Sequence, residues 1–260
     1  MTLSIIPKKS LGQHFLKDAN IRDKIINQLD ATAEDHVVEI GPGTGALTGH
    51  LAARYPTLEA VELDDRAVAH LKERFPDLKV HLGDVVKYDW VAHAEAAGGK
   101  LHIVGNLPYY VTSQVVFGLL DAHTHIAEAV LMMQREVAER LVAKPRTKAY
   151  GILSVAVQQL VVPQLAFRVS RNVFYPKPDV ESAVVHLVFK DNPADLGSID
   201  AAWLRKVVRT AFNQRRKTLR NSLSRITSEC SQEIPEEWRM KRAEELSPEE
   251  FIALAQHLKG

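Results

Sequence analysis

Short apolar runs alternate with amphipathic segments of helical length from about residue 37 to residue 133. This alternation predicts a mostly parallel β-sheet with helices packed on its faces. The apolar runs that predict strands are 37–40, 58–62, 79–81, 102–104 and 128–133, and two later runs, 164–169 and 183–189, complete an expected sheet of seven strands. Helices are expected to begin near Thr44, Asp65, Thr112 and Gln134, and a further helix is expected over residues 20–29.

The pattern changes after Lys190. Residues 191–198 are polar and include Pro193, which predicts a linker, and the rest of the chain has helical periodicity. The apolar residues of the first of these helices share one face: Leu204, Val207, Val208, Ala211 and Phe212. Residues 247–250, Ser-Pro-Glu-Glu, form a capping box that opens a last helix ending near His257. We therefore expect an α/β domain over residues 1–192 and a smaller α-helical domain over residues 199–260.

Composition limits the class of protein. With 260 residues, 46% of them hydrophobic and 25% charged, the chain can bury a full globular core. Its longest apolar stretches, 127–133 and 152–162, are far shorter than the roughly 20 residues of a membrane helix. No membrane span and no signal peptide are expected. The single cysteine, Cys230, excludes an internal disulfide and favours a cytoplasmic protein.

The net charge of +1 hides an uneven distribution. Residues 201–228 hold eight Arg or Lys and no acidic residue, whereas residues 229–250 hold eight Glu against three basic residues. A solvated helix face is the ordinary explanation of one such run. A phosphate-bearing partner is the alternative, which the charge pattern alone does not decide.

A glycine-rich turn, Glu-Ile-Gly-Pro-Gly-Thr-Gly at residues 39–45, follows the first expected strand and precedes a helix. Glycines in this position allow a ligand to approach the backbone closely. Glu62 lies 21 residues after Gly41, where an acidic residue would bind a ribose. The turn alone is compatible with a nicotinamide dinucleotide as well as with another nucleoside cofactor, so an NAD-type dehydrogenase remains open at this point.

Two later features favour a different chemistry. Asp84 lies just beyond the third strand, placed to accept a hydrogen bond from an adenine amino group. The tetrapeptide Asn106-Leu107-Pro108-Tyr109 ends the fourth strand, at the carboxyl edge where open α/β sheets bind ligands. Hydride transfer by a dehydrogenase does not require this tetrapeptide, whereas methyl transfer to an amino nitrogen does.

The amino group of adenine is a poor nucleophile because its lone pair is delocalised into the ring. The Asn106 oxygen and a neighbouring backbone carbonyl can hold both amine hydrogens, so that the nitrogen lone pair turns toward a methyl donor. Pro108 stiffens the turn, and Tyr109 offers a face on which a flipped base can stack. We therefore expect Asn106, Leu107, Pro108 and Tyr109 to form the catalytic turn.

Several segments together carry a resemblance. They are the glycine turn, residues 9–16 (Lys-Ser-Leu-Gly-Gln-His-Phe-Leu), 106–109, 174–178 (Phe-Tyr-Pro-Lys-Pro) and 211–221 (Ala-Phe-Asn-Gln-Arg-Arg-Lys-Thr-Leu-Arg-Asn). On these segments the chain resembles the ribosomal RNA adenine dimethyltransferase family, in its 16S branch rather than the 23S branch associated with erythromycin resistance. The resemblance implies a Rossmann-like, S-adenosylmethionine-dependent methyltransferase domain followed by a smaller helical domain. It also implies a monomeric enzyme whose substrate is two adjacent adenosines near the 3′ end of 16S rRNA within the small ribosomal particle.

The resemblance also implies site residues. The cofactor would be bound by His14, Leu16, Gly41, Glu62, Asp84 and Asn106. Glu62 would bind the ribose hydroxyls, Asp84 the adenine amine, and residues 14–16 would cover the cofactor, His14 through its backbone. Phe174 would stack on the target base opposite Tyr109.

The basic segments would then meet RNA phosphates. The expected contacts are Arg215, Arg216, Lys217 and Arg220 in the helical tail and Arg140, Lys144, Arg146 and Lys148 near the sheet edge, and Lys8, Lys9 and Lys17 are a third candidate group. The competing interpretation is that the tail residues brace the helical domain through ion pairs with carboxylates such as Glu236 or Glu244.

Other functions have less support. A DNA adenine methyltransferase more often carries Asp-Pro-Pro-Tyr and lacks the basic block of residues 212–217. A catalytically silent ribosome-assembly or transcription factor of the same fold would not need Glu62, Asp84 and Asn106. Covalent pyrimidine methylation lacks a nucleophile, because Cys230 lies outside the expected sheet domain. The closest approach to metal-ligand spacing is His123-Thr124-His125, and we expect no metal.

Overall fold

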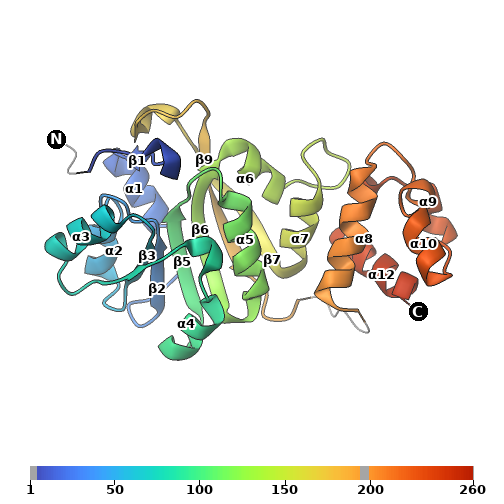
Figure 1. Ribbon diagram of the computed structural model, residues 1–260, viewed down its shortest axis with the longest axis horizontal. Helices are drawn as coiled ribbons and strands as arrows, with labels where there is room; N and C mark the ends of the chain where they lie inside the picture. Colours follow the sequence, from blue (N-terminus) through green and yellow to red (C-terminus); the bar gives the residue numbers. More distant parts are fainter. Residues whose placement is uncertain (1–4, 194–198, 260) are drawn as a thin grey trace. The chain divides into compact units, whose positions relative to one another are not determined.

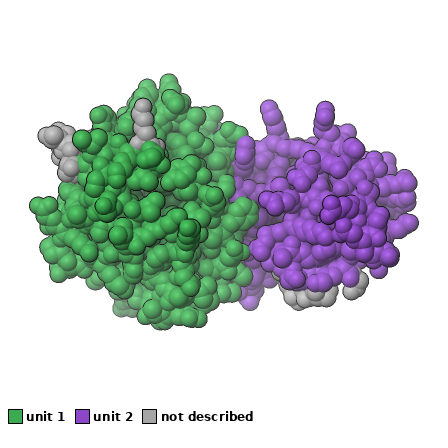
Figure 2. All heavy atoms as spheres, viewed as in Figure 1, with its two compact units in different colours: residues 1–138, 163–189 green, residues 139–162, 190–260 purple. Residues whose placement is uncertain are grey.

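The computed structural model describes residues 5–193 and 199–259. Contacts divide the chain into two compact units (Figure 2), one of Met1–Ala138 and Pro163–Phe189, the other of Glu139–Val162 and Lys190–Gly260. This division differs from the predicted domains, 1–192 and 199–260, because residues 139–162 belong with the helical unit. Tyr150 and Val155 from this segment are fully buried in one hydrophobic cluster with Val207 and Phe251.

The first unit contains the sheet (Figure 1). Its seven strands have the order β4-β3-β2-β5-β6-β9-β7. Their bounds are β2 His36–Ile40, β3 Glu59–Glu62, β4 Lys79–Leu82, β5 Leu101–Asn106, β6 Ile126–Gln134, β7 Val161–Val169 and β9 Ser182–Phe189. Strands β4, β3, β2, β5 and β6 run parallel to one another, and β9 is antiparallel to β6. The predicted seven-stranded α/β fold is confirmed.

Helices follow the strands as the alternating pattern requires. They are α1 Ala19–Ile26, α2 Thr48–Arg54, α3 Asp65–Arg74, α4 Trp90–Ala97, α5 Thr112–Asp121 and α6 Arg135–Leu141. Short 3-10 turns occur at η1 Lys9–Leu11, η2 Val85–Lys87, η3 His123–His125, η4 Arg171–Val173 and η5 Ala243–Glu245. Helix α4 was not expected. The central strands are buried almost throughout, as in β6, because helices cover a parallel sheet on both faces.

The helix expected to begin near Thr44 begins four residues later, at Thr48. Gly41, Gly43 and Gly45 have φ angles of 64°, 56° and 81°. These left-handed conformations are unfavourable for residues with a side chain, and they interrupt helical geometry. The glycines therefore extend the turn beyond β2 and delay the helix.

From Ala201 onward the second unit is helical, as predicted. Its helices are α7 Ile152–Leu160, α8 Ala201–Asn213, α9 Leu219–Ser222, α10 Ser224–Cys230, α11 Glu236–Arg239 and α12 Pro248–Lys259. The five apolar residues expected to share one face of α8 are all buried. The capping box at α12 is confirmed: the Glu250 backbone N–H donates to Ser247 Oγ at 3.2 Å, and the Ser247 backbone N–H donates to Glu250 Oε2 at 2.8 Å. Across the described residues, no helix is both long and apolar enough to cross a membrane.

Candidate active site

A cleft lies at the carboxyl ends of β2, β3 and β5. Leu11, Gly12, Gln13, His14, Phe15, Gly41, Gly43, Glu62, Leu63, Asn106, Leu107, Pro108, Tyr109 and Tyr110 line it. Parallel strands end at the same edge of a sheet, so residues 41, 62 and 106 meet there although they are far apart in sequence. The structure thus brings together most of the predicted site. Leu16, Asp84 and Phe174 are not among the lining residues.

Glu62 is held in place by backbone N–H groups. Its Oε2 accepts the N–H of Gly43 at 3.0 Å, and its Oε1 accepts the N–H groups of Leu63 at 2.8 Å and Asp64 at 2.9 Å. Burial raises the pKa of Glu62 and outweighs these hydrogen bonds, which act in the opposite direction. An ionised carboxylate has about four acceptor sites, so Glu62 keeps acceptor capacity for a ligand in a fixed orientation.

Glu39 is a buried acid beneath the glycine turn that was not singled out from the sequence. It is 1% exposed, and the Thr48 hydroxyl donates to its Oε2 at 2.7 Å. Burial raises the pKa of Glu39 to about 8. The residue therefore remains protonated at neutral pH and couples β2 to the first turn of α2.

The N-terminal segment lies against the cleft. Strand β1, Phe15–Leu16, pairs antiparallel with β8, Phe174–Tyr175. Gln13 Nε2 donates to Asp64 Oδ2 at 2.9 Å, and Lys8 Nζ lies 3.4 Å from Asp64 Oδ1. The Phe15 ring packs so closely over Gly43 that a Cβ there would lie 2.9 Å from it. The segment is therefore attached at both of its ends and at the glycine turn.

His14 joins three parts of the site. Its Nδ1 lies 2.7 Å from the Pro176 carbonyl oxygen, and because that oxygen can only accept, Nδ1 carries the hydrogen. The His14 carbonyl accepts the Asn106 Nδ2–H at 2.9 Å. The His14 ring stacks on that of Tyr109, with centroids 5.5 Å apart and planes 26° apart. The His14 side chain thus contacts two other parts of the site, which the residue pattern did not indicate, and the expected backbone contact of His14 with the cofactor stays a prediction.

This arrangement orients the Asn106 amide. Since the His14 carbonyl is an acceptor, it must face the NH₂ group of Asn106, and Asn106 Oδ1 then points elsewhere. Within residues 5–193 and 199–259 this oxygen has no hydrogen-bond partner. Tyr109 is fixed as well, because its hydroxyl lies 2.8 Å from Ser182 Oγ, and burial raises the pKa of Tyr109. Ser182, 73 residues away, gave no signal in the sequence.

Three predicted residues lie outside the cleft lining. Leu16 is 7% exposed and belongs to the hydrophobic core. Asp84 follows β4 next to the cleft edge, where it accepts the Val86 N–H at 3.0 Å. Phe174 is 3% exposed and packs in the same core as Leu16, so in this conformation it offers no face to a base. The neighbouring Tyr175, which is on the opposite side of β8, is 46% exposed.

The predicted RNA-contact residues of the tail separate into two kinds. Arg215 is held within the helical unit: its Nε donates to Glu244 Oε2 at 2.6 Å, and its two terminal nitrogens donate to the carbonyls of Lys148 at 2.8 Å and Thr147 at 3.0 Å. Arg216, Lys217 and Arg220 are exposed, and among the described residues their side chains have no recorded partner. The bracing ion pair with Glu244 is therefore present at Arg215, whereas Glu236 pairs with Arg239.

The second predicted basic patch is also exposed. Arg140, Lys144, Arg146 and Lys148 all lie at the surface of the helical unit. Arg146 takes a left-handed conformation, with φ of 68°, and its backbone N–H donates to the Glu244 carbonyl at 2.6 Å. The Glu244 side chain thus accepts a hydrogen bond from Arg215, and its backbone carbonyl accepts one from Arg146. These two hydrogen bonds hold the segment 144–148 against the helices.

The profile of the ribosomal RNA adenine dimethylase family matches residues 7–259. A protein of Salinibacter ruber named ribosomal RNA small subunit methyltransferase A is 52% identical over 260 residues, covering 99% of this chain and 87% of its own. The protein of that name from Chlorobium chlorochromatii is 44% identical over 252 residues, covering 96% and 93%.

Solved structures share the architecture. A dimethyladenosine transferase from Plasmodium falciparum superposes with a TM-score of 0.78 at 25% identity, covering 93% of this chain and 96% of its own. The 23S rRNA methyltransferase ErmE has a TM-score of 0.69 at 24% identity, covering 95% and 100%. With the family profile spanning nearly the whole chain, this protein belongs to the ribosomal RNA adenine dimethylase family.

Proposed function

We propose that this protein transfers methyl groups from S-adenosylmethionine to the exocyclic amino nitrogen of two adjacent adenosines near the 3′ end of 16S rRNA, giving dimethyladenosines. The observation that carries the proposal is the Asn106 amide in the cleft lining. Its nitrogen donates to the His14 carbonyl, and its oxygen has no hydrogen-bond partner among the described residues. The names of the Salinibacter and Chlorobium relatives support a small-subunit substrate over 23S rRNA.

The cleft suits S-adenosylmethionine. Gly41 lines it, and a Cβ at this position would meet only the Asn106 carbonyl oxygen, at 3.7 Å, so the backbone there is open to a ligand. Glu62 offers its remaining acceptor capacity to ribose hydroxyls, and Asp84 offers a carboxylate oxygen to an adenine amine. When bound, the cofactor supplies an electrophilic methyl group. The attached N-terminal segment shields this part of the cleft from water.

Two acceptors can hold the substrate amine. Asn106 Oδ1 is one. The Pro108 carbonyl is a poor second, since it already accepts the Val111 N–H at 3.2 Å and the Thr112 hydroxyl at 3.2 Å. The Leu107 carbonyl accepts no hydrogen bond within the described residues and is the better second acceptor. With both amine hydrogens held, the nitrogen lone pair is no longer confined to the ring and would be directed at the methyl group that the bound cofactor would supply. The amine proton, made acidic by methylation, would then be lost to solvent.

The target base must leave its stack to reach this turn. Tyr109 is fixed by Ser182 and covered on one face by His14, so its other face is available for base stacking. A stacking role for Phe174 requires the ring to leave the core. Arg216, Lys217 and Arg220 supply exposed charge for rRNA phosphates. We place the reaction in the cytoplasm, on the small ribosomal particle or its precursor, with the enzyme acting as a monomer.

The deciding experiment uses unmethylated small ribosomal particles, radiolabelled S-adenosylmethionine and mass spectrometry of RNA fragments. We expect dimethyladenosine at two adjacent positions near the 3′ end of 16S rRNA and none in large particles. Asn106→Ala should lower the single-turnover rate by about 10² to 10³, as for loss of a preorganised dipole. Asn20→Ala, which removes an exposed asparagine of α1, is the matched control. Labelling of 23S rRNA, or full activity of Asn106→Ala at saturating cofactor and particle, contradicts the proposal.

A further inference from the structure

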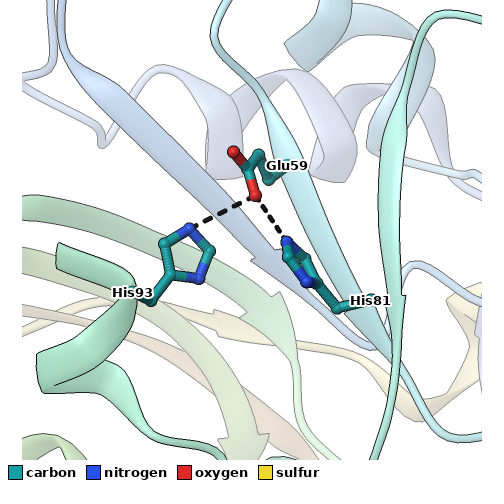
Figure 3. Close-up of side chains that lie close together, drawn as sticks. All are labelled: Glu59, His81 and His93. Carbon is teal, nitrogen blue, oxygen red and sulfur yellow. Dashed lines mark hydrogen bonds and ion pairs between the residues drawn. The ribbon is translucent and has the colours of Figure 1, made fainter. Parts of the chain in front are cut away.

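Three side chains that do not line the cleft converge at the β4 edge of the sheet. Glu59 is the first residue of β3, His81 lies on the edge strand β4, and His93 lies on α4. Their polar ends point toward one another (Figure 3). Glu59 Oε2 lies 2.5 Å from His81 Nε2 and 3.4 Å from His93 Nε2. Nothing in the proposed methyl transfer uses this group, because none of its three residues lines the cleft.

The cluster is oriented by a further partner. The Tyr88 hydroxyl lies 2.6 Å from His93 Nδ1. If Nδ1–H donates to the Tyr88 oxygen, the Nε2 lone pair of His93 faces the Glu59 carboxylate. Metal-bound histidines characteristically have their second nitrogen held in this way. The three side chains are also largely buried, with exposures of 7% for His93, 21% for Glu59 and 29% for His81.

The distances suit a small cation. Zinc binds histidine nitrogen and carboxylate oxygen at about 2.0 to 2.2 Å, so tetrahedral ligand atoms lie roughly 3.3 to 3.5 Å apart. The His93–Glu59 separation of 3.4 Å already has this value. The separation of 2.5 Å between His81 Nε2 and Glu59 Oε2 is that of a hydrogen bond, and its proton lies between two atoms that would both bind the metal. Rotation of the partly exposed His81 side chain would widen this separation to the value that a metal requires.

We propose that Glu59, His81 and His93 form a binding site for a divalent transition-metal ion of the zinc class. Two imidazoles and one carboxylate are a donor set that zinc accepts, with solvent at the fourth position. The ion would replace the proton between His81 and Glu59, which is released to solvent. Because β4 is the edge strand of the described sheet, next to β3, the ion would join this strand and α4 to the sheet.

A second group of possible ligands is less suitable. Asp30, Glu128 and His186 also converge. However, Glu128 already accepts the Asp30 backbone N–H at 2.9 Å and His102 Nδ1–H at 2.7 Å on Oε1, with His186 at Oε2. A metal there would displace hydrogen bonds at both oxygens of a carboxylate that is 3% exposed, whereas the exposed Lys79 contacts Glu59 at Oε1, at 3.1 Å, and not at Oε2. Among the described residues, the His123-Thr124-His125 sequence is not a candidate, because neither histidine belongs to a group of three converging ligand side chains.

The test titrates untagged protein with zinc chloride by calorimetry, and with cobalt(II) by visible absorption, in a Cys230→Ser background that removes the free thiol. We expect one ion per chain, a melting temperature that rises with zinc concentration, and cobalt absorption bands typical of tetrahedral coordination. His93→Gln and His81→Gln should each weaken binding about 100-fold, and Tyr88→Phe should weaken it about tenfold through loss of orientation. His123→Gln is the matched control.

Failure of the unaltered protein to bind zinc overturns the proposal. So does binding that survives His93→Gln, or that His123→Gln weakens equally. Circular dichroism and S-adenosylmethionine affinity of each variant verify folding. If His93→Gln does not fold, Tyr88→Phe and Glu59→Gln provide the same comparison. Methyl transfer is not a readout, so the outcome is independent of the proposed function.

Discussion

Replacement of Arg216, Lys217 and Arg220 by alanine in one variant tests whether the helical tail binds rRNA. These side chains are exposed and, among the described residues, unpaired, so their loss should leave the fold intact. Each phosphate contact contributes about 0.7 to 0.9 to the slope of log K against log salt, so three contacts predict a slope smaller by about 2 to 3. S-adenosylmethionine affinity should not change.

Arg215→Ala should behave in the opposite way. Arg215 donates to Glu244 and to two backbone carbonyls, and its side chain is 36% exposed. Hydrogen bonds from a charged group are worth about 1.5 to 3 kcal/mol each when buried, and solvent reduces this, so we expect a total loss of about 1 to 3 kcal/mol in unfolding free energy. The folded fraction should bind particles with an unaltered salt slope.

Both variants are measured in one assay series. Fluorescence anisotropy with labelled small particles over a range of salt concentrations gives the slope, and thermal unfolding of the same preparations gives stability. A triple variant with the original slope would refute the phosphate contacts. An Arg215→Ala protein with original stability and a reduced slope would show that Arg215 leaves Glu244 to bind RNA, contrary to the reasoning from the structure.

Three further changes test other parts of the molecule. Tyr109→Phe removes the hydrogen bond to Ser182 and should lower the methyl-transfer rate roughly tenfold, about 1.4 kcal/mol, with little change in cofactor affinity; an equal loss of both would place the effect in folding. Burial raises the pKa of Glu39 to about 8 in the native state, whereas the pKa of the unfolded chain is the ordinary 4.5. The free energy of unfolding in urea should therefore fall as pH rises between these values, by up to about 5 kcal/mol. Glu39→Gln should abolish this pH dependence. Burial opposes ionisation of Glu128, but hydrogen bonds from His102 and His186 outweigh it and lower its pKa to about 2, while the pKa of His186 is raised by its hydrogen bond to Glu128. Stabilisation by Glu128 is therefore present above its ordinary pKa of 4.5 and lost toward pH 2, and that by His186 is present below 6.5 and lost as pH rises through its raised pKa. Glu128→Gln should lower the free energy of unfolding by about 3 kcal/mol near pH 6 and weaken its dependence on pH at both the acid and the alkaline end. An unchanged pH dependence at both ends would contradict this prediction.

Local patterns in the sequence were sufficient to predict several features of the fold. The alternation of apolar and amphipathic segments predicted the strands of the sheet, the glycines predicted the turn after β2, and the serine-proline-glutamate sequence predicted the start of α12. The position of Glu62 and Asn106 at one edge also followed from sequence, because all parallel strands that are crossed over by helices end on the same side. These conclusions need only the period of side chains along the chain and the direction of each strand.

Tertiary structure alone decided which side chains meet. Phe174 points into the core and Tyr175 outward because strand β8 pairs with β1, and a two-residue strand carries no periodicity from which this could be read. Tyr109 meets Ser182 across 73 residues, and Glu59 meets His81 across 22. Such contacts depend on strand register and on helix packing, in which a shift of one residue turns a side chain to the other face. For the same reason the sequence treated Arg215 and Arg216 alike, whereas packing against Glu244 pairs the first and leaves the second exposed.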